Sequence, residues 1–167
     1  MIALVRVDNR LVHGQILEAW VPRLGAKRIV VADDDAAAST LAKAAMMLPL
    51  PPDLAGAVLP VERIDYAALA STPERVLLLF RDVEAVTRAW RAGLTPRMAP
   101  RVNLGNVHYT SGRCAVTPSV FLSADEVRQV EELSAAGFQV DACAVPSDSL
   151  AGPREMRDRF EANALKR

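Results

Sequence analysis

The chain has few of the residues that mark metal-dependent or disulfide-stabilised proteins. Its 167 residues include two cysteines and two histidines. Cys114 and Cys143 stand far apart, in no C-x-x-C or metal-like spacing, so we expect two buried, reduced thiols. The adjacent acids Asp33, Asp34 and Asp35 have no partner ligands nearby in the sequence, and acids suit a helix N-terminus. We therefore expect no metal and no cofactor.

Net charge and long apolar runs are also absent. Twenty basic residues balance twenty acidic ones, so no overall field draws the chain to nucleic acid or to an anionic membrane. No stretch approaches the roughly eighteen apolar residues of a membrane span, and the opening run Met1–Val7 is too short for a signal peptide. These features predict a cytoplasmic protein without membrane insertion. The length and ordinary composition predict a single domain, residues 1–167.

Short apolar runs alternate with helix-like stretches along the chain. Several runs are apolar throughout, which is typical of parallel strands that are covered on both faces. The sequence thus predicts an α/β fold, an open, mostly parallel twisted sheet of about seven strands with helices on both faces. This prediction allows one edge strand to be antiparallel. The predicted strands are Ile2–Val7, Arg28–Ala32, Ala57–Val61, Val76–Phe80, Arg101–Leu104, Ser119–Leu122 and Phe138–Ala144.

The intervening segments carry helix start and stop signals. Ser123 with Glu126 three residues later forms a capping-box pattern, and Gly137 is the residue type preferred just past a helix. A further helix is expected to begin near Gly14 and to be kinked or shortened by Pro22. The other predicted helices are Ala36–Leu48, Asp82–Trp90 and Ser123–Ala136.

The stretch "VRVDNRLVHGQI", residues 5–16, places polar residues just beyond the first predicted strand. In open parallel sheets, ligands bind beyond the carboxyl ends of the strands, and the N–H groups of a following helix N-terminus suit a phosphate. Arg10 supplies a fork matched to phosphate oxygens, and Gly14 allows close approach. His13, neutral in large part near pH 7, can attack phosphorus. Position alone leaves an alternative interpretation, in which His13 is a surface or loop-packing residue and Arg10 is an ordinary solvated charge.

Other nucleotide or phosphate motifs are absent. No G-x-G-x-x-G follows the first predicted strand, which disfavours dinucleotide binding, and no P-loop pattern occurs. His108, in "NLGNVHYTSG", follows the fifth predicted strand and so belongs to the same edge of the sheet. A histidine that is hydrogen-bonded within its loop is the favoured interpretation there, and a functional role is the alternative.

"RVDNRLVHGQI" resembles the signature of the IIB components of the mannose/fructose/sorbose class of the bacterial phosphoenolpyruvate-dependent sugar phosphotransferase system. The segments "IVVADDDAA", "VLLLFRD", "RVNLGNVH" and "GFQVDACAVPSD" extend the resemblance along the chain in order. The resemblance implies an open, largely parallel α/β domain and a protein-Nπ-phosphohistidine–sugar phosphotransferase. His13 would accept a phosphoryl group from a phosphohistidine of a IIA protein and donate it to a sugar entering through membrane IIC and IID subunits. Arg10 would contact the phosphoryl group, and the residues expected around it are Asn9, Gly14, Gln15 and Asn106.

Two positions depart from the family pattern. Asn9 stands where a second acid is common, and Asn106 stands where a second glycine is usual. The missing charge at Asn9 leaves a second interpretation open, a regulatory phosphoprotein in which a partner reads phospho-His13 and no sugar is modified. The sequence does not separate the two, and it identifies neither the sugar nor the oligomeric state.

Overall fold

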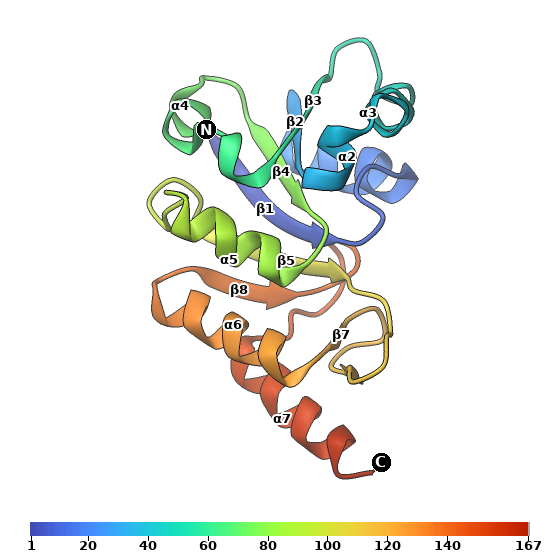
Figure 1. Ribbon diagram of the computed structural model, residues 1–167, viewed down its shortest axis with the longest axis vertical. Coiled ribbons are helices and arrows are strands. Elements are labelled where there is room, and N and C mark those ends of the chain that lie inside the picture. Colours follow the sequence, from blue (N-terminus) through green and yellow to red (C-terminus); the bar gives the residue numbers. More distant parts are fainter. Residues whose placement is uncertain (167) are drawn as a thin grey trace.

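One parallel sheet organises the protein (Figure 1). The computed structural model describes residues 1–166. The sheet has six strands in the order β3-β2-β4-β1-β5-β8, and every neighbouring pair is parallel. The prediction of an open, mostly parallel α/β sheet is therefore confirmed. The strands are β1 Ile2–Asp8, β2 Arg28–Ala32, β3 Ala55–Leu59, β4 Val76–Phe80, β5 Arg101–Asn106 and β8 Gln139–Ala142.

Burial follows the apolar runs of the sequence. All five residues of β4 are buried, and β1 is buried at six of its seven positions. Strands β2, β3 and β4 lie to one side of β1, whereas β5 and β8 lie to the other. The strand order therefore reverses at β1, and in open sheets such a reversal creates a crevice beyond the carboxyl ends of the strands.

Helices cover both faces of the sheet, as predicted (Figure 1). One apolar core lies under α4, α5 and α6, and a second lies under the helical segment after β1 and under α2 and α3. The capping box of α6, formed by Ser123 and Glu126, is present as the sequence predicts. The helices are η1 Ile16–Trp20, α1 Val21–Leu24, α2 Asp34–Ala38, α3 Thr40–Met47, η2 Val61–Arg63, α4 Tyr66–Ser71, α5 Val83–Arg91, α6 Ala124–Ala135 and α7 Pro153–Ala164.

Two helical segments differ from the prediction. The helix expected over Ala36–Leu48 is two helices, because Ser39 is extended (φ −109°, ψ 113°) and its side chain caps α3. The helix that begins at Gly14 widens into the π-helical turn η1 before Pro22. Proline has no N–H to donate to the preceding turn, so the helix accommodates it by changing its hydrogen-bond spacing.

The segment predicted as a strand over residues 119–122 lies outside the main sheet. Phe121–Leu122 (β7) pairs antiparallel with Cys114–Ala115 (β6) in a separate two-stranded sheet, and Val120 forms an isolated parallel bridge with Val107. The sequence did not predict α4 or α7. Helix α7 packs against α6 and β6, below the main sheet in Figure 1. Both Cys114 and Cys143 are free and buried, as expected.

Candidate functional site

Asp8, the last residue of β1, is the centre of the polar cluster at the carboxyl edge of the sheet. Its side chain is fully buried and contacts three basic side chains. Asp8 Oδ2 lies 3.1 Å from an Arg6 guanidinium nitrogen and 3.0 Å from His13 Nε2, whereas Asp8 Oδ1 accepts from Arg10 Nε at 3.2 Å. One carboxylate thus brings together the two residues that the sequence predicted as catalytic, His13 and Arg10.

A tight turn after β1 sets this geometry. Leu11 adopts the left-handed conformation with φ 56°, which is unusual for a residue other than glycine. Its N–H donates to the Asp8 carbonyl at 2.9 Å, and its side chain is buried in the second core. The Arg10 N–H meanwhile donates to Asp8 Oδ1 at 3.2 Å. Strain of about 1–3 kcal/mol at such a residue persists only where the surrounding structure enforces it. Here the left-handed conformation of Leu11 turns the loop back around the Asp8 carboxylate.

The surroundings of Asp8 determine which nitrogen of His13 carries the proton. Burial alone would raise the pKa of Asp8, but hydrogen bonds from His13 and Arg10 and the charge of Arg6 outweigh it and lower that pKa. An ionised carboxylate is only an acceptor, so His13 Nε2 must be the donor. In the neutral ring, Nδ1 therefore carries the lone pair. Within residues 1–166, Nδ1 has no hydrogen-bond partner, and the His13 side chain is 16% exposed.

Arg6 holds the other side of Asp8 and is completely buried. It donates to the Asn103 side chain and to the carbonyl oxygens of Cys143 (3.3 Å) and Ala144 (3.0 Å). Its guanidinium carbon lies 4.6 Å from the ring centroid of Trp20, a cation–π distance. Burial lowers the pKa of Arg6, an effect that the charge of Asp8 opposes. Sequence reasoning did not predict Arg6 and Asp8 as parts of the site, nor the side chains of Asn103 and Trp20 that contact Arg6.

Gly105 leaves the space that the Arg6 guanidinium fills. A Cβ atom at Gly105 would lie 1.9 Å from the guanidinium carbon, far inside van der Waals contact. Gly14 differs, because a Cβ there would meet nothing closer than Glu18 Oε1 at 3.8 Å. The protein itself therefore does not require a glycine at position 14. The bare backbone at this helix start leaves room for an approaching group.

The other predicted phosphate ligands divide into two sets. Gln15 lies beside the predicted catalytic pair, and its Oε1 accepts from Arg10 at 3.3 Å. The Asn9 side chain instead donates to the Arg81 carbonyl at 2.7 Å and accepts from the His108 N–H. Asn106 Nδ2 lies 2.9 Å from His108 Nε2. The amides of Asn9 and Asn106 are thus bonded within the protein, where they connect the loops that follow β1, β4 and β5.

Fold and site together define a class, an open parallel α/β protein that presents a carboxylate-bound histidine where the strand order reverses. The chain belongs to the IIB components of the sorbose subfamily of the phosphotransferase system (PTS), because the model of the family "PTS system sorbose subfamily IIB component" matches residues 2–165. The family resemblance inferred from the sequence is thereby confirmed.

Named relatives and solved structures agree with this assignment. The fructose-specific EIIB component of Bacillus subtilis is 29% identical over 150 residues, which cover 89% of this chain and 90% of the relative. The IIB domain of the sorbose permease from Klebsiella pneumoniae superposes with a TM-score of 0.83 at 25% identity, over 95% of this chain and 97% of that one. The mannose-specific EIIAB component of Escherichia coli is also 29% identical, but this chain spans only 46% of its length.

No helix within residues 1–166 is long and apolar enough to cross a membrane.

The relatives that this chain matches are named for different sugars, fructose, mannose and sorbose among them. Their names therefore support membership of a sugar phosphotransferase family without selecting one sugar.

Replacing Gly105 by alanine tests the space around Arg6. Because the added Cβ would overlap the guanidinium, we expect Arg6 to be displaced and Asp8 to lose its buried partner. Breaking a buried ion pair costs about 3–5 kcal/mol, which urea denaturation of Gly105→Ala would measure. Gly14→Ala is the matched control and should keep wild-type stability. Equal stability of the two variants would contradict this packing.

The pKa of Asp8 provides a second test. Its folded-state pKa is lowered, so the stabilisation from this carboxylate is complete above the ordinary value of 3.8 and is lost as the pH falls through the folded value. A carbon-13 NMR titration of the Asp8 carboxyl group should give a midpoint below 3.8. A midpoint at or above the ordinary value would mean that burial outweighs the three basic partners, which would contradict this account of the site.

Proposed function

We propose that this chain is a cytoplasmic phosphocarrier of sugar uptake. His13 accepts a phosphoryl group from a phosphohistidine of a IIA protein and donates it to a sugar that enters through membrane IIC and IID subunits. This is the activity of a protein-Nπ-phosphohistidine–sugar phosphotransferase. The observation that carries the proposal is the hydrogen bond of His13 Nε2 to the buried Asp8 carboxylate, which leaves Nδ1 as the nucleophile.

The transfer step needs little proton movement. The Nδ1 lone pair of His13 attacks phosphorus, a new N–P bond forms, and the N–P bond to the donor imidazole breaks. The Nε2 proton stays in its hydrogen bond to Asp8. The ring gains positive character as the bond forms, and the ionised carboxylate 3.0 Å away stabilises that charge. Phosphoryl transfer depends mainly on positioning and on charge stabilisation, and the contacts around Asp8 supply both.

Arg10 and the start of the following helix receive the phosphoryl oxygens in this proposal. The Arg10 side chain is 44% exposed although it is tethered to Asp8, so its guanidinium can also face an incoming group. Gly14 opens the helix, and even a Cβ there would meet nothing closer than Glu18 Oε1 at 3.8 Å. Guanidinium forks and the N–H groups of helix starts are both suited to phosphate. Gln15 orients Arg10 through its hydrogen bond.

The regulatory alternative rested on the missing charge at Asn9. The Asn9 amide both donates to the Arg81 carbonyl and accepts from the His108 N–H, and a carboxylate could do only the second. Local hydrogen bonding is thus sufficient reason for an amide at this position. No specific observation favours regulation, and sugar phosphorylation is the function that we propose.

Phosphorylation of His13 is tested by radiolabel transfer. Wild-type protein is incubated with labelled phosphoenolpyruvate, the two general phosphotransferase proteins and a IIA protein, and the acid-labile label is mapped. We expect the label on His13 and none in His13→Ala. His108→Ala is the matched control and should be labelled normally, because His108 bonds to Asn106 and does not contact Asp8. Label on His108, or label retained in His13→Ala, would refute the assignment.

The contribution of Arg10 is tested by Arg10→Lys. Lysine keeps the charge but lacks the fork that spans Asp8 and the phosphoryl oxygens. A charge-assisted hydrogen bond is worth about 1.5–3 kcal/mol, so single-turnover transfer should slow by roughly ten- to a hundredfold. The circular dichroism spectrum should not change. An unchanged transfer rate would show that Arg10 makes no contact in the transition state.

A further inference from the structure

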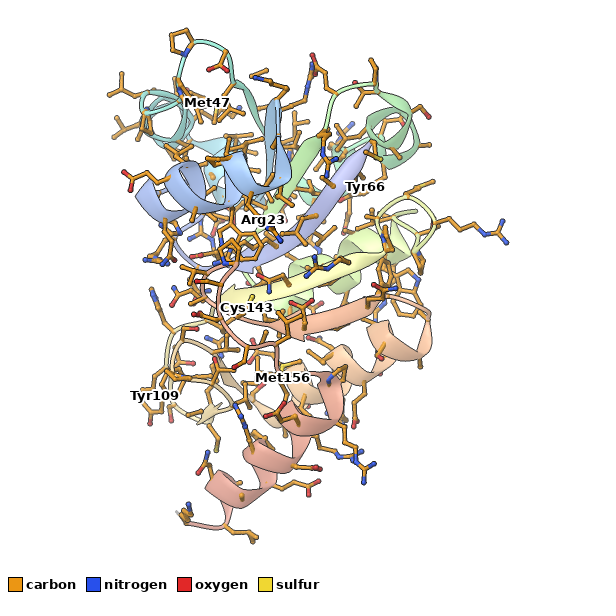
Figure 2. All side chains as sticks on the ribbon, turned by 180° about the vertical axis from the view of Figure 1, so that it is seen from behind. Arg23, Met47, Tyr66, Tyr109, Cys143 and Met156 are labelled. Carbon is orange, nitrogen blue, oxygen red and sulfur yellow. The ribbon has the colours of Figure 1, made fainter. Side chains whose placement is uncertain are left out.

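A polar groove lies on the sheet face opposite α5 and α6. It is a groove of about 570 Å³ between α1 and the loop after β8. Figure 2 shows this side of the molecule, with Arg23 of α1 and Cys143 of that loop labelled. The lining includes none of Asp8, Arg10 and His13. The groove is therefore separate from the proposed phosphotransfer site.

Three arginines line this groove, and they come from three different parts of the chain. Arg23 comes from α1, Arg75 precedes β4, and Arg101 begins β5. Within residues 1–166, neither Arg23 nor Arg75 pairs with a carboxylate, whereas Arg101 contacts Asp141 at 3.1 Å. Asp148 is the one acid among the described lining residues, and its carboxylate accepts from the Val145 N–H. The lining therefore has an excess of positive charge in a chain whose overall charge is zero.

Neighbouring side chains hold part of the groove in place. Asp141, the partner of Arg101, also accepts from Asn103 Nδ2 at 2.6 Å, and Asn103 in turn binds Arg6. Trp20, in the wall of the groove, is fixed by a hydrogen bond of 3.2 Å from its Nε1 to the Ala144 carbonyl. A site whose walls are already ordered loses less conformational entropy on binding.

From these contacts we propose that the groove binds a small phosphorylated metabolite. Guanidinium forks match phosphate oxygens in geometry as well as charge. The volume lies within the range of about 300–1,000 Å³ that is typical of small-molecule sites. The apolar side chains of Trp20, Leu24 and Leu150 also line the groove and would pack against the carbon skeleton of an ester. Inorganic phosphate lacks such a skeleton, so we expect it to bind more weakly than an ester.

Titration of the unphosphorylated protein with glucose 6-phosphate tests the site. The Nε–Hε NMR signals of the groove arginines should shift, with a dissociation constant of about 1 mM or lower. The double variant Arg23→Gln/Arg75→Gln should weaken binding at least tenfold. Both side chains are exposed, so the fold should survive. Arg91→Gln on α5 is the matched control and should bind as the wild type does.

Three further arms complete the experiment. Glucose alone should cause no shift, inorganic phosphate should bind more weakly than the ester, and Arg10→Gln should leave groove binding intact. Loss of binding in Arg10→Gln would place the ester at the His13 site and overturn the proposal. The proposal would also be overturned if the double variant bound the ester as tightly as the wild type, or if glucose or inorganic phosphate bound the wild type as tightly as the ester. It would be overturned as well if no signal shifted at an ester concentration 10-fold above the expected dissociation constant of about 1 mM. None of these arms requires phosphoryl transfer, so they are independent of the proposed function.

Discussion

The buried carboxylate of Asp8 determines how the carboxyl edge of this sheet is built. It lies at the end of the central strand β1. There it binds Arg6 of the same strand, and Arg10 and His13 of the loop that follows. An isolated carboxylate is costly to bury. Removal of one partner from a buried pair typically destabilises a protein by about 3–5 kcal/mol. The contacts of Asp8 with these residues are therefore both a structural requirement and the source of the His13 orientation.

Segments that are distant in the sequence converge to satisfy this one charge. Arg6 reaches Asp8 because Gly105 of β5 leaves room for its guanidinium, whose carbon also lies 4.6 Å from the ring centroid of Trp20. The loop after β8 supplies two carbonyl acceptors. On the other side, Asn9 connects the His13 loop to the ends of β4 and β5. The order of strands at the reversal point explains why these segments meet around Asp8.

Sequence reasoning predicted the sheet and the position of His13 because both depend on local pattern. The apolar run Val76–Phe80 and the loop that follows β1 are short-range signals. Arg6 was missed because an arginine in a strand is normally exposed, although Arg6 and Asp8 are two residues apart and so share one face of β1. Helix α7 was missed because its charged residues obscure the spacing of Met156 and Phe160, which contact the first core. The role of Gly105 depends on packing between strands, which local pattern does not encode.

The central claim is that Asp8 holds His13 through Nε2 and so directs phosphate to Nδ1. Nitrogen-15 and phosphorus-31 NMR of the phosphorylated protein, with labelled histidine, tests it directly. The account predicts phosphorus coupled to His13 Nδ1 and a proton on Nε2 that is hydrogen-bonded to the Asp8 carboxylate. Phosphorus coupled to Nε2 would contradict the account, because that nitrogen would then have had to leave Asp8 before the transfer.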